Sequence, residues 1–187
     1  MSEWWTYRLS DFLMFSPAVY ARMVERYHRE LAPLPWVLLA VGLVLIAWAA
    51  TRKPWARGVV LITLAMLWAW VGWAFHWQRH AQINWAAQYL AWAWWLQAAL
   101  LVVWAIVPRS ANRTWPGACH AGIAIAALGV LLYPVHGHAF GLMPAPTALA
   151  TLGLMAMQCQ RRDKWLMVIP ALMLMVEALT LWAIVAN

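Results

Sequence analysis

One acidic residue, Glu177, lies inside a long apolar stretch of the sequence. A charged side chain at the centre of a membrane costs about 2.5–3.5 kcal/mol on insertion scales, so such an acid is protonated, paired or in contact with water. Thr180 lies one helical turn further on, on the same helix face. The pattern predicts a proton or cation site at Glu177; the alternative is a neutral carboxyl that only holds two helices together.

Two further candidates lie in other apolar stretches. Gln97 is near the middle of one stretch, where an amide normally hydrogen-bonds to a neighbouring helix. Trp73 belongs to a crowd of tryptophans that could wall a cavity or hold a cation against their ring faces. Bulky packing between helices and lipid explains the same tryptophans. If Gln97 faced Glu177, the pair would mark a polar cavity.

Histidines supply the other candidate chemistry. His76 and His80 are four residues apart, so both rings can approach one ion from the same helix face. His136 and His138 flank a glycine in a loop that also contains proline. Four such imidazoles could hold copper, zinc or a haem iron. Interfacial histidines are also common in ordinary loops, and no ligand motif of known spacing is present.

The composition determines the elements that would position these residues. Of 187 residues, 66% are hydrophobic and 10% are charged, against about 45–50% and about 25% in soluble domains. The apolar residues fall in runs of roughly the 20 residues that cross about 30 Å of hydrocarbon. The sequence therefore predicts an all-α integral membrane protein. Many of its 17 tryptophans are expected at the headgroup level.

Six transmembrane helices are expected, of which the fifth is short. The predicted spans cover residues 34–50, 58–77, 85–107, 117–133, 145–159 and 165–185. Together they form one domain from residue 34 to residue 187. The fourth span repeats small residues at Ala118, Gly122 and Ala126, which allows another helix to approach closely.

Residues 1–33 are predicted to form an arm that precedes this domain. Ser16 and Pro17 have the residue types of a helix N-cap and a first helical residue, and the residues that follow separate into an apolar and a charged face. The charged face carries the i,i+4 pairs Glu25–Arg29 and Arg26–Glu30. Such a helix is typical of the membrane interface or of a contact with a partner subunit. An aromatic segment within residues 4–15 is expected to add a second anchor.

Lysine and arginine gather in alternate connections. The first, third and fifth connections hold Arg52, Lys53, Arg57, Arg109, Arg113, Arg161, Arg162 and Lys164. The second holds Arg79 alone and the fourth holds none. Because positively charged loops face the cytoplasm, both termini and five of the six histidines are expected on the outer side. The arginines of the arm count against this orientation.

Several function classes are disfavoured. No basic stripe accompanies a soluble fold, so we do not interpret the net charge of +7 as a nucleic-acid signal. Two cysteines, Cys119 and Cys159, are too few for a disulfide framework. The sequence contains no nucleotide-binding loop and no serine-hydrolase, zinc-protease or haem-attachment motif. A non-enzymatic role is therefore favoured.

The chain opens with a distinctive set of short segments. These are Ser2-Glu3-Trp4-Trp5-Thr6-Tyr7, Leu9-Ser10-Asp11-Phe12 and Phe15-Ser16-Pro17, followed by Tyr20 and Arg22. This opening resembles that of a family of uncharacterised bacterial multi-pass membrane proteins. The resemblance implies a location in the bacterial cytoplasmic membrane, and it supplies no activity and no site residues.

Three functions are expected, in this order. The first is a non-enzymatic membrane protein that binds or moves a small solute, an ion or a proton, with Glu177 as its ionisable centre. The second is a membrane redox or metal-handling protein that uses the outer-face histidines. The third is an accessory subunit of a larger complex. In each case the chain lies in the lipid bilayer, and further copies of it or a partner membrane subunit could adjoin it.

Overall fold

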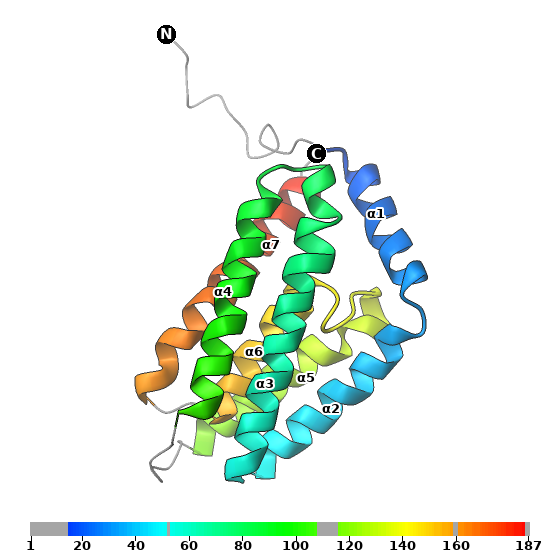
Figure 1. Ribbon diagram of the computed structural model, residues 1–187. Coiled ribbons are helices and arrows are strands. Elements are labelled where there is room, and N and C mark those ends of the chain that lie inside the picture. Colours follow the sequence, from blue (N-terminus) through cyan, green and yellow to red (C-terminus); the bar gives the residue numbers. More distant parts are fainter. Residues whose placement is uncertain (1–14, 52, 108–115, 159–160, 186–187) are drawn as a thin grey trace.

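A computed structural model describes residues 15–51, 53–107, 116–158 and 161–185. Within these residues the regular structure is entirely helical (Figure 1). The elements are α1 (Pro17–Glu30), α2 (Leu34–Thr51), α3 (Pro54–Trp70), η3 (Val71–Trp77), η4 (His80–Gln82), α4 (Ala87–Ile106), α5 (Pro116–His136), α6 (Pro144–Gln158), η5 (Arg161–Met167) and α7 (Val168–Val185). The opening motif before Phe15, the anchor predicted there, and Arg52, Arg109, Arg113 and Cys159 lie outside the described residues.

The helices confirm the prediction of an all-α membrane protein. Among the described residues, five helical stretches are long and apolar enough to cross a membrane: Leu34–Thr51, Trp55–Gln82, Ala87–Ile106, Cys119–His136 and Asp163–Ile184. Large apolar side chains on these helices point away from the bundle; Ile106 is 75% exposed and Val135 is 71% exposed. A surface of this kind suits hydrocarbon rather than water.

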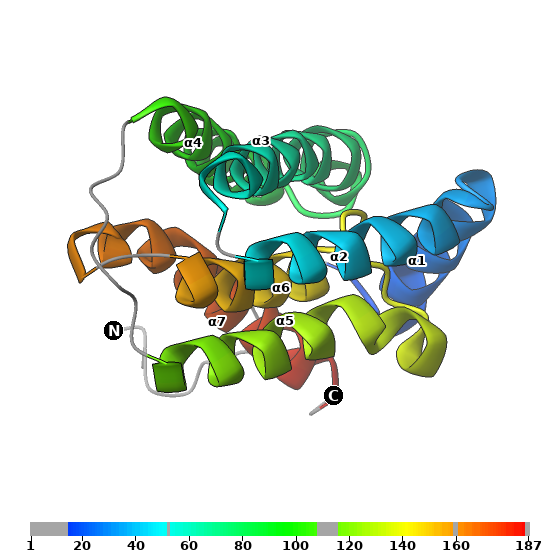
Figure 2. The ribbon, with the colours of Figure 1, turned by 90° about the horizontal axis from the view of Figure 1, so that it is seen from below.

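The fifth predicted span differs from the other five. Helix α6 has 15 residues and therefore rises about 22 Å, less than the roughly 30 Å of a hydrocarbon core. It contacts α2, α3, α5 and α7, and it lies in the middle of the bundle when this is viewed from below (Figure 2). Most of its side chains are buried. Six spans with a short fifth are expected; among the described residues there are five helices long enough to cross a membrane, and the short one, α6, lies in the core.

Small residues hold α6 against α5. A Cβ atom on Gly122 would lie 2.7 Å from the carbonyl oxygen of Gly153, and one on Gly129 would lie 2.6 Å from the backbone nitrogen of Ala150. Such distances leave no room for a side chain, so the two backbones are in direct contact. The predicted close approach to the fourth span is confirmed.

Helix α1 begins where the sequence predicts and packs against its own bundle. Ser16 is the N-cap, with its side chain accepting a hydrogen bond from the Val19 N–H at 3.4 Å. Both predicted i,i+4 ion pairs form on the exposed face. The opposite face buries Tyr20 and Tyr27, and α1 runs beside η3, which continues the helix of α3 upward (Figure 1). The arm's apolar face is therefore covered by the rest of the chain.

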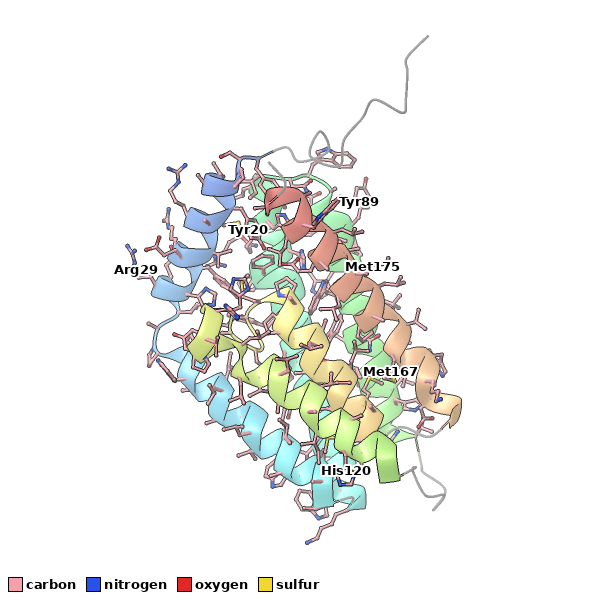
Figure 3. The ribbon with its side chains drawn as sticks, turned by 180° about the vertical axis from the view of Figure 1, so that it is seen from behind. Tyr20, Arg29, Tyr89, His120, Met167 and Met175 are labelled. Atoms are coloured by element: carbon pink, nitrogen blue, oxygen red, sulfur yellow. The ribbon has the colours of Figure 1, made fainter. Side chains whose placement is uncertain are left out.

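From α2 onward the helices alternate in direction, so alternate connections lie at the same end (Figure 1). The ends of α2, α4 and α6 lie at the lower end of the bundle in Figure 1. These ends flank the three basic connections. His120 lies at this end, and Tyr20 and Tyr89 lie at the other (Figure 3). The separation predicted between His120 and the α1 side of the molecule is therefore present.

The connection between α5 and α6 is a buried loop. Residues 139–143 are buried although none of them is helical. Gly141 has φ +78°, a backbone conformation that favours glycine, and a Cβ there would lie 2.9 Å from the side chain of Leu67 and 3.2 Å from that of Leu38. Its N–H donates to Thr147 Oγ1 at 2.8 Å. The loop packs between α2 and α3 and closes the bundle below α1.

Candidate functional site

The helix that carries His76 and His80 ends in wide turns. After α3 the chain continues as a π-helix, in which the Gln78 N–H donates to the carbonyl of Trp73 five residues earlier at 3.0 Å. Normal α-helical spacing predicts that Trp73 shares a face with the two histidines. Instead, Trp73 is 47% exposed, whereas His76 and His80 are 2% and 3% exposed. The wider turns separate the tryptophan from the imidazoles.

Glu177 is paired with a tyrosine from the N-terminal helix. The Tyr20 hydroxyl donates to Glu177 Oε1 at 3.1 Å, and each residue is only 5% exposed. Burial, followed by the negative charge and hydrogen bond of Glu177, raises the pKa of Tyr20 well above its ordinary value. The hydroxyl therefore keeps its proton and remains a donor.

The two histidines continue from this pair into the bundle. The rings of Tyr20 and His80 are 5.9 Å apart between centroids, and those of His80 and His76 are 5.8 Å apart. We call Tyr20, His76, His80 and Glu177 the buried polar cluster; its members come from α1, η3, η4 and α7. Phe75 packs against both imidazoles, with centroid distances of 5.1 and 5.6 Å.

Both ring nitrogens of His76 and of His80 are buried without a hydrogen-bond partner in the described part of the chain. Buried polar atoms in proteins are nearly always hydrogen-bonded, so each of these nitrogens is suited to a polar species from outside the chain. A neutral imidazole offers one donor and one acceptor. Each ring would therefore both donate a hydrogen bond to, and accept one from, a polar species that reached it.

Two tryptophans form the inner wall of this region. Trp94 lies 5.5 Å from His76 between ring centroids and stacks on Trp68 at 3.9 Å. Trp68 is fixed by a hydrogen bond from its Nε1–H to Thr151 Oγ1 at 2.8 Å. The tryptophans beside the buried polar cluster are thus Trp68 and Trp94 rather than the exposed Trp73, and that they wall a site stays a prediction.

Gln97 and Thr180 form local contacts elsewhere. Gln97 Nε2 donates to the Leu166 carbonyl at 3.1 Å. That carbonyl would normally accept from residue 170, which is proline and has no N–H. Thr180 donates to the carbonyl of Val176 at 2.9 Å. The structure thus gives Gln97 the predicted cross-helix role, and it does not bring Gln97 or Thr180 into a hydrogen bond with Glu177.

A second group of histidines includes His28, near the C-terminal end of α1. His28 stacks on Tyr133 and accepts a hydrogen bond from the Ala139 N–H at 3.4 Å. Burial, and then the nearby His28 and His136, lower the pKa of His138. No three His, Cys, Asp or Glu side chains among the described residues are grouped so that they could hold a metal ion. The four imidazoles predicted as one ligand set therefore lie in two separate groups.

Tyr20 is the member of the buried polar cluster that sequence reasoning missed as a site residue. Its spacing places it on the apolar face of the arm, and its partner lies 157 positions away. The available signal was a hydroxyl on an otherwise apolar helix face. Such a hydroxyl needs a hydrogen-bond partner when it is buried.

One comparison bears on the chain as a whole. A family model described as a family of unknown function (DUF6064) matches residues 18–186. The chain belongs to this family. No curated protein and no solved structure matches it. The matched region contains every member of the buried polar cluster. It begins after Pro17, so of the opening residues it includes only Tyr20 and Arg22.

Proposed function

We propose that this membrane protein binds and relays a proton, or a small solute that exchanges hydrogen bonds, at the buried polar cluster. Glu177 would be its ionisable centre. The observation that carries the proposal is the succession of a buried carboxyl, a tyrosine hydroxyl and two imidazoles with unpartnered nitrogens among the described residues. Buried ionisable groups at membrane depth mark ion and proton pathways by default.

The chemistry of the cluster suits transfer in short steps. The Tyr20 hydroxyl already donates to Glu177. The nitrogens of the two imidazoles make no hydrogen bond to this pair in the described part of the chain, although the rings of Tyr20 and His80 are in edge contact. A water or small solute that reached both the Tyr20 hydroxyl and an imidazole nitrogen would link them. Each hydroxyl or imidazole on this path would have to accept one proton as it gives up another, so that Tyr20 is protonated again after every transfer.

The wide helical turns next to the cluster also support a site. A π-helix is rare, and short π-helical stretches often occur at functional sites. Here the π-helical segment carries His76 and leads directly to His80. An α-helix in its place would present different residues to Tyr20.

The orientation in the membrane follows from the basic connections. We place the protein in the bacterial cytoplasmic membrane, with these connections in the cytoplasm and both termini outside. The supporting observation is that the helix ends that flank the basic connections lie together, opposite Tyr20 (Figure 3). A periplasmic phosphatase fused to the C-terminus should be active, and a cytoplasmic fluorescent reporter there should be dark; the reverse result would invert the orientation.

The runner-up is a redox or metal-handling protein in which His76 and His80 bind copper, zinc or a haem iron. The specific observation in its favour is the close pair of unpartnered imidazoles. A metal there would need further ligands from outside the described residues. Stoichiometric metal by elemental analysis, or a Soret band in the optical spectrum of the isolated protein, would favour this reading. Stoichiometric co-purification of another membrane subunit would favour the accessory role.

Proton flux tests the proposal directly. Protein reconstituted into vesicles that enclose a pH-sensitive dye should dissipate an imposed pH gradient. Glu177→Gln should abolish this flux, whereas Glu25→Gln, the same change at an exposed acid of α1, should leave it intact. Equal flux in the two variants would eliminate Glu177 as the ionisable centre. Vesicles with wild-type protein that leak no faster than empty ones would refute the relay.

A further inference from the structure

A groove of about 610 Å³ separates α1 from the end of the helix formed by η3 and η4. Ligand sites in proteins have volumes of about 300–1,000 Å³, so this groove is large enough for a small molecule or a lipid headgroup. None of the four members of the buried polar cluster lines it. It is therefore a separate candidate site.

The groove is positively charged. Arg22, Arg26 and Arg79 line it, together with a single acid, Glu30. Hydrogen bonds from Arg26 and then Arg79 lower the pKa of Glu30, so this carboxyl is ionised at neutral pH. Three positive charges and one negative charge leave a net charge of +2 around the groove. An anion is the complementary ligand.

Arg79 is fixed as part of the groove wall. Its Nη1 donates to the Ala74 carbonyl at 2.7 Å and its Nη2 donates to Glu30 at 3.1 Å. Its guanidinium carbon lies 4.3 Å from the centroid of the Tyr27 ring, a cation–π contact. Burial raises the pKa of Tyr27 to about 12, so the ring beneath the cation is uncharged. The guanidinium of Arg79 is thus held in the groove wall, where its charge can face an anion without a change in the side-chain conformation.

The other two arginines, Arg22 and Arg26, have guanidinium N–H groups that are not used in hydrogen bonds to the described residues. Arg26 donates to Glu30 through Nε at 2.7 Å, and no other hydrogen bond of its guanidinium to the described residues is formed. Arg22 forms no ion pair or hydrogen bond with any residue of the described ranges and is exposed. A guanidinium with free N–H groups binds phosphate oxygens through two parallel hydrogen bonds, which is a geometry that favours phosphate over a simple halide.

We propose that this groove binds a phosphate-bearing anion, with Arg22 as the principal ligand and Arg26 and Arg79 as supporting charges. The phosphate could belong to an anionic phospholipid or to a soluble phosphate ester. Trp73 lines the groove and is 47% exposed, and tryptophan favours the headgroup level of a membrane. The groove therefore suits the phosphate of a phospholipid and that of a soluble ester, and the experiment must distinguish between the two ligands.

Native mass spectrometry of the full chain in detergent supplies the test. Phosphatidylglycerol, which is anionic, and phosphatidylcholine, which is zwitterionic, are titrated separately. We expect tighter binding of phosphatidylglycerol, and Arg22→Gln should weaken it by about tenfold or more, because a charge-assisted hydrogen-bonded pair is lost. The matched control is Arg29→Gln on the same helix, since Arg29 pairs with Glu25 and does not line the groove. This control should bind as the wild type does.

Inorganic phosphate distinguishes the two sources. If millimolar phosphate displaces phosphatidylglycerol from the wild type but not from Arg22→Gln, the site recognises the phosphate group itself. If phosphatidylglycerol binding depends on Arg22 and phosphate does not compete, the ligand is the lipid headgroup. Equal phosphatidylglycerol binding by the Arg22→Gln and Arg29→Gln variants would overturn the proposal, as would failure of both phosphatidylglycerol and phosphate to bind the wild type.

Discussion

Tyr20 in the first described helix donates a hydrogen bond to Glu177 in the last, across 157 positions of sequence. This bond joins α1 to α7. Because both residues are buried, the partner of Glu177 depends on where α1 lies. The docking of the N-terminal helix and the environment of the buried carboxyl are therefore coupled.

Removing the hydroxyl of Tyr20 should destabilise the protein. In Tyr20→Phe the buried carboxyl loses its donor while the shape of the ring is kept, so we expect the free energy of unfolding to fall by about 1–3 kcal/mol. Denaturant unfolding in detergent measures the change. Tyr89→Phe is the matched control because Tyr89 is 69% exposed. The hydrogen bond would have no role in stability if the two variants unfolded at the same denaturant concentration.

Gln97 and Pro170 should show energetic coupling. Gln97→Leu removes the side-chain donor to the buried Leu166 carbonyl and should lower stability by about 1–3 kcal/mol. In a Pro170→Ala background residue 170 has an N–H that can reach this carbonyl, so the same change should be less damaging. The four proteins form a double-mutant cycle, and a coupling energy near zero would contradict the account.

Acid should destabilise the protein partly through His138. The pKa of this residue is lower in the folded protein than its ordinary value, which is about 6.5. Below that pH the unfolded chain binds more protons than the folded one, so stability falls as pH falls. His138→Asn should lose less thermal stability than the wild type between pH 7 and pH 5. His120→Asn, at the lower end of the bundle in Figure 3, should follow the wild type; an identical slope in all three proteins would exclude His138.

Adding one methyl group at the α5–α6 contact should be harmful. In Gly153→Ala the new Cβ would meet the backbone nitrogen of Ala126, and it would lie 2.6 Å from the Gly122 carbonyl oxygen. Backbone atoms cannot move aside as a flexible side chain can, so we expect a loss of about 1–3 kcal/mol or more. Gly58→Ala has no atom within 4 Å of the new Cβ and should stabilise α3 by up to about 1 kcal/mol. Thermal unfolding of both variants tests the contrast, and a stable Gly153→Ala protein would refute the packing argument.

Local patterns predict much of the fold. Apolar runs give the approximate bounds of α2, α4 and α7, and the Ser16-Pro17 pair gives the start of α1. The spacing of small residues predicts that another helix packs closely against α5. These properties depend on residues that are neighbours along the chain, or one helical turn apart, and they can be read without knowledge of the tertiary structure.

The composition of the site is less predictable. Glu177, His76 and His80 are recognisable because polar residues are rare in apolar runs, but Tyr20 joins them only through tertiary packing. The separation of Trp73 from His76 has another cause. Hydrophobic periodicity assumes α-helical turns, and the sequence of residues 71–77 contains no pattern that predicts a π-helix. The central position of α6 likewise follows from its neighbours rather than from its own sequence.

The buried loop between α5 and α6 has a consequence for amide hydrogen exchange. Irregular segments normally exchange their amide protons quickly, because water reaches them without unfolding of the protein. Here the Gly141 N–H is bonded to Thr147 and the Met143 N–H to the Ala139 carbonyl at 2.9 Å, all within the interior. These protons can exchange only when the helices around them separate. The loop should therefore be labelled by deuterium as slowly as the core helices, and more slowly than α1.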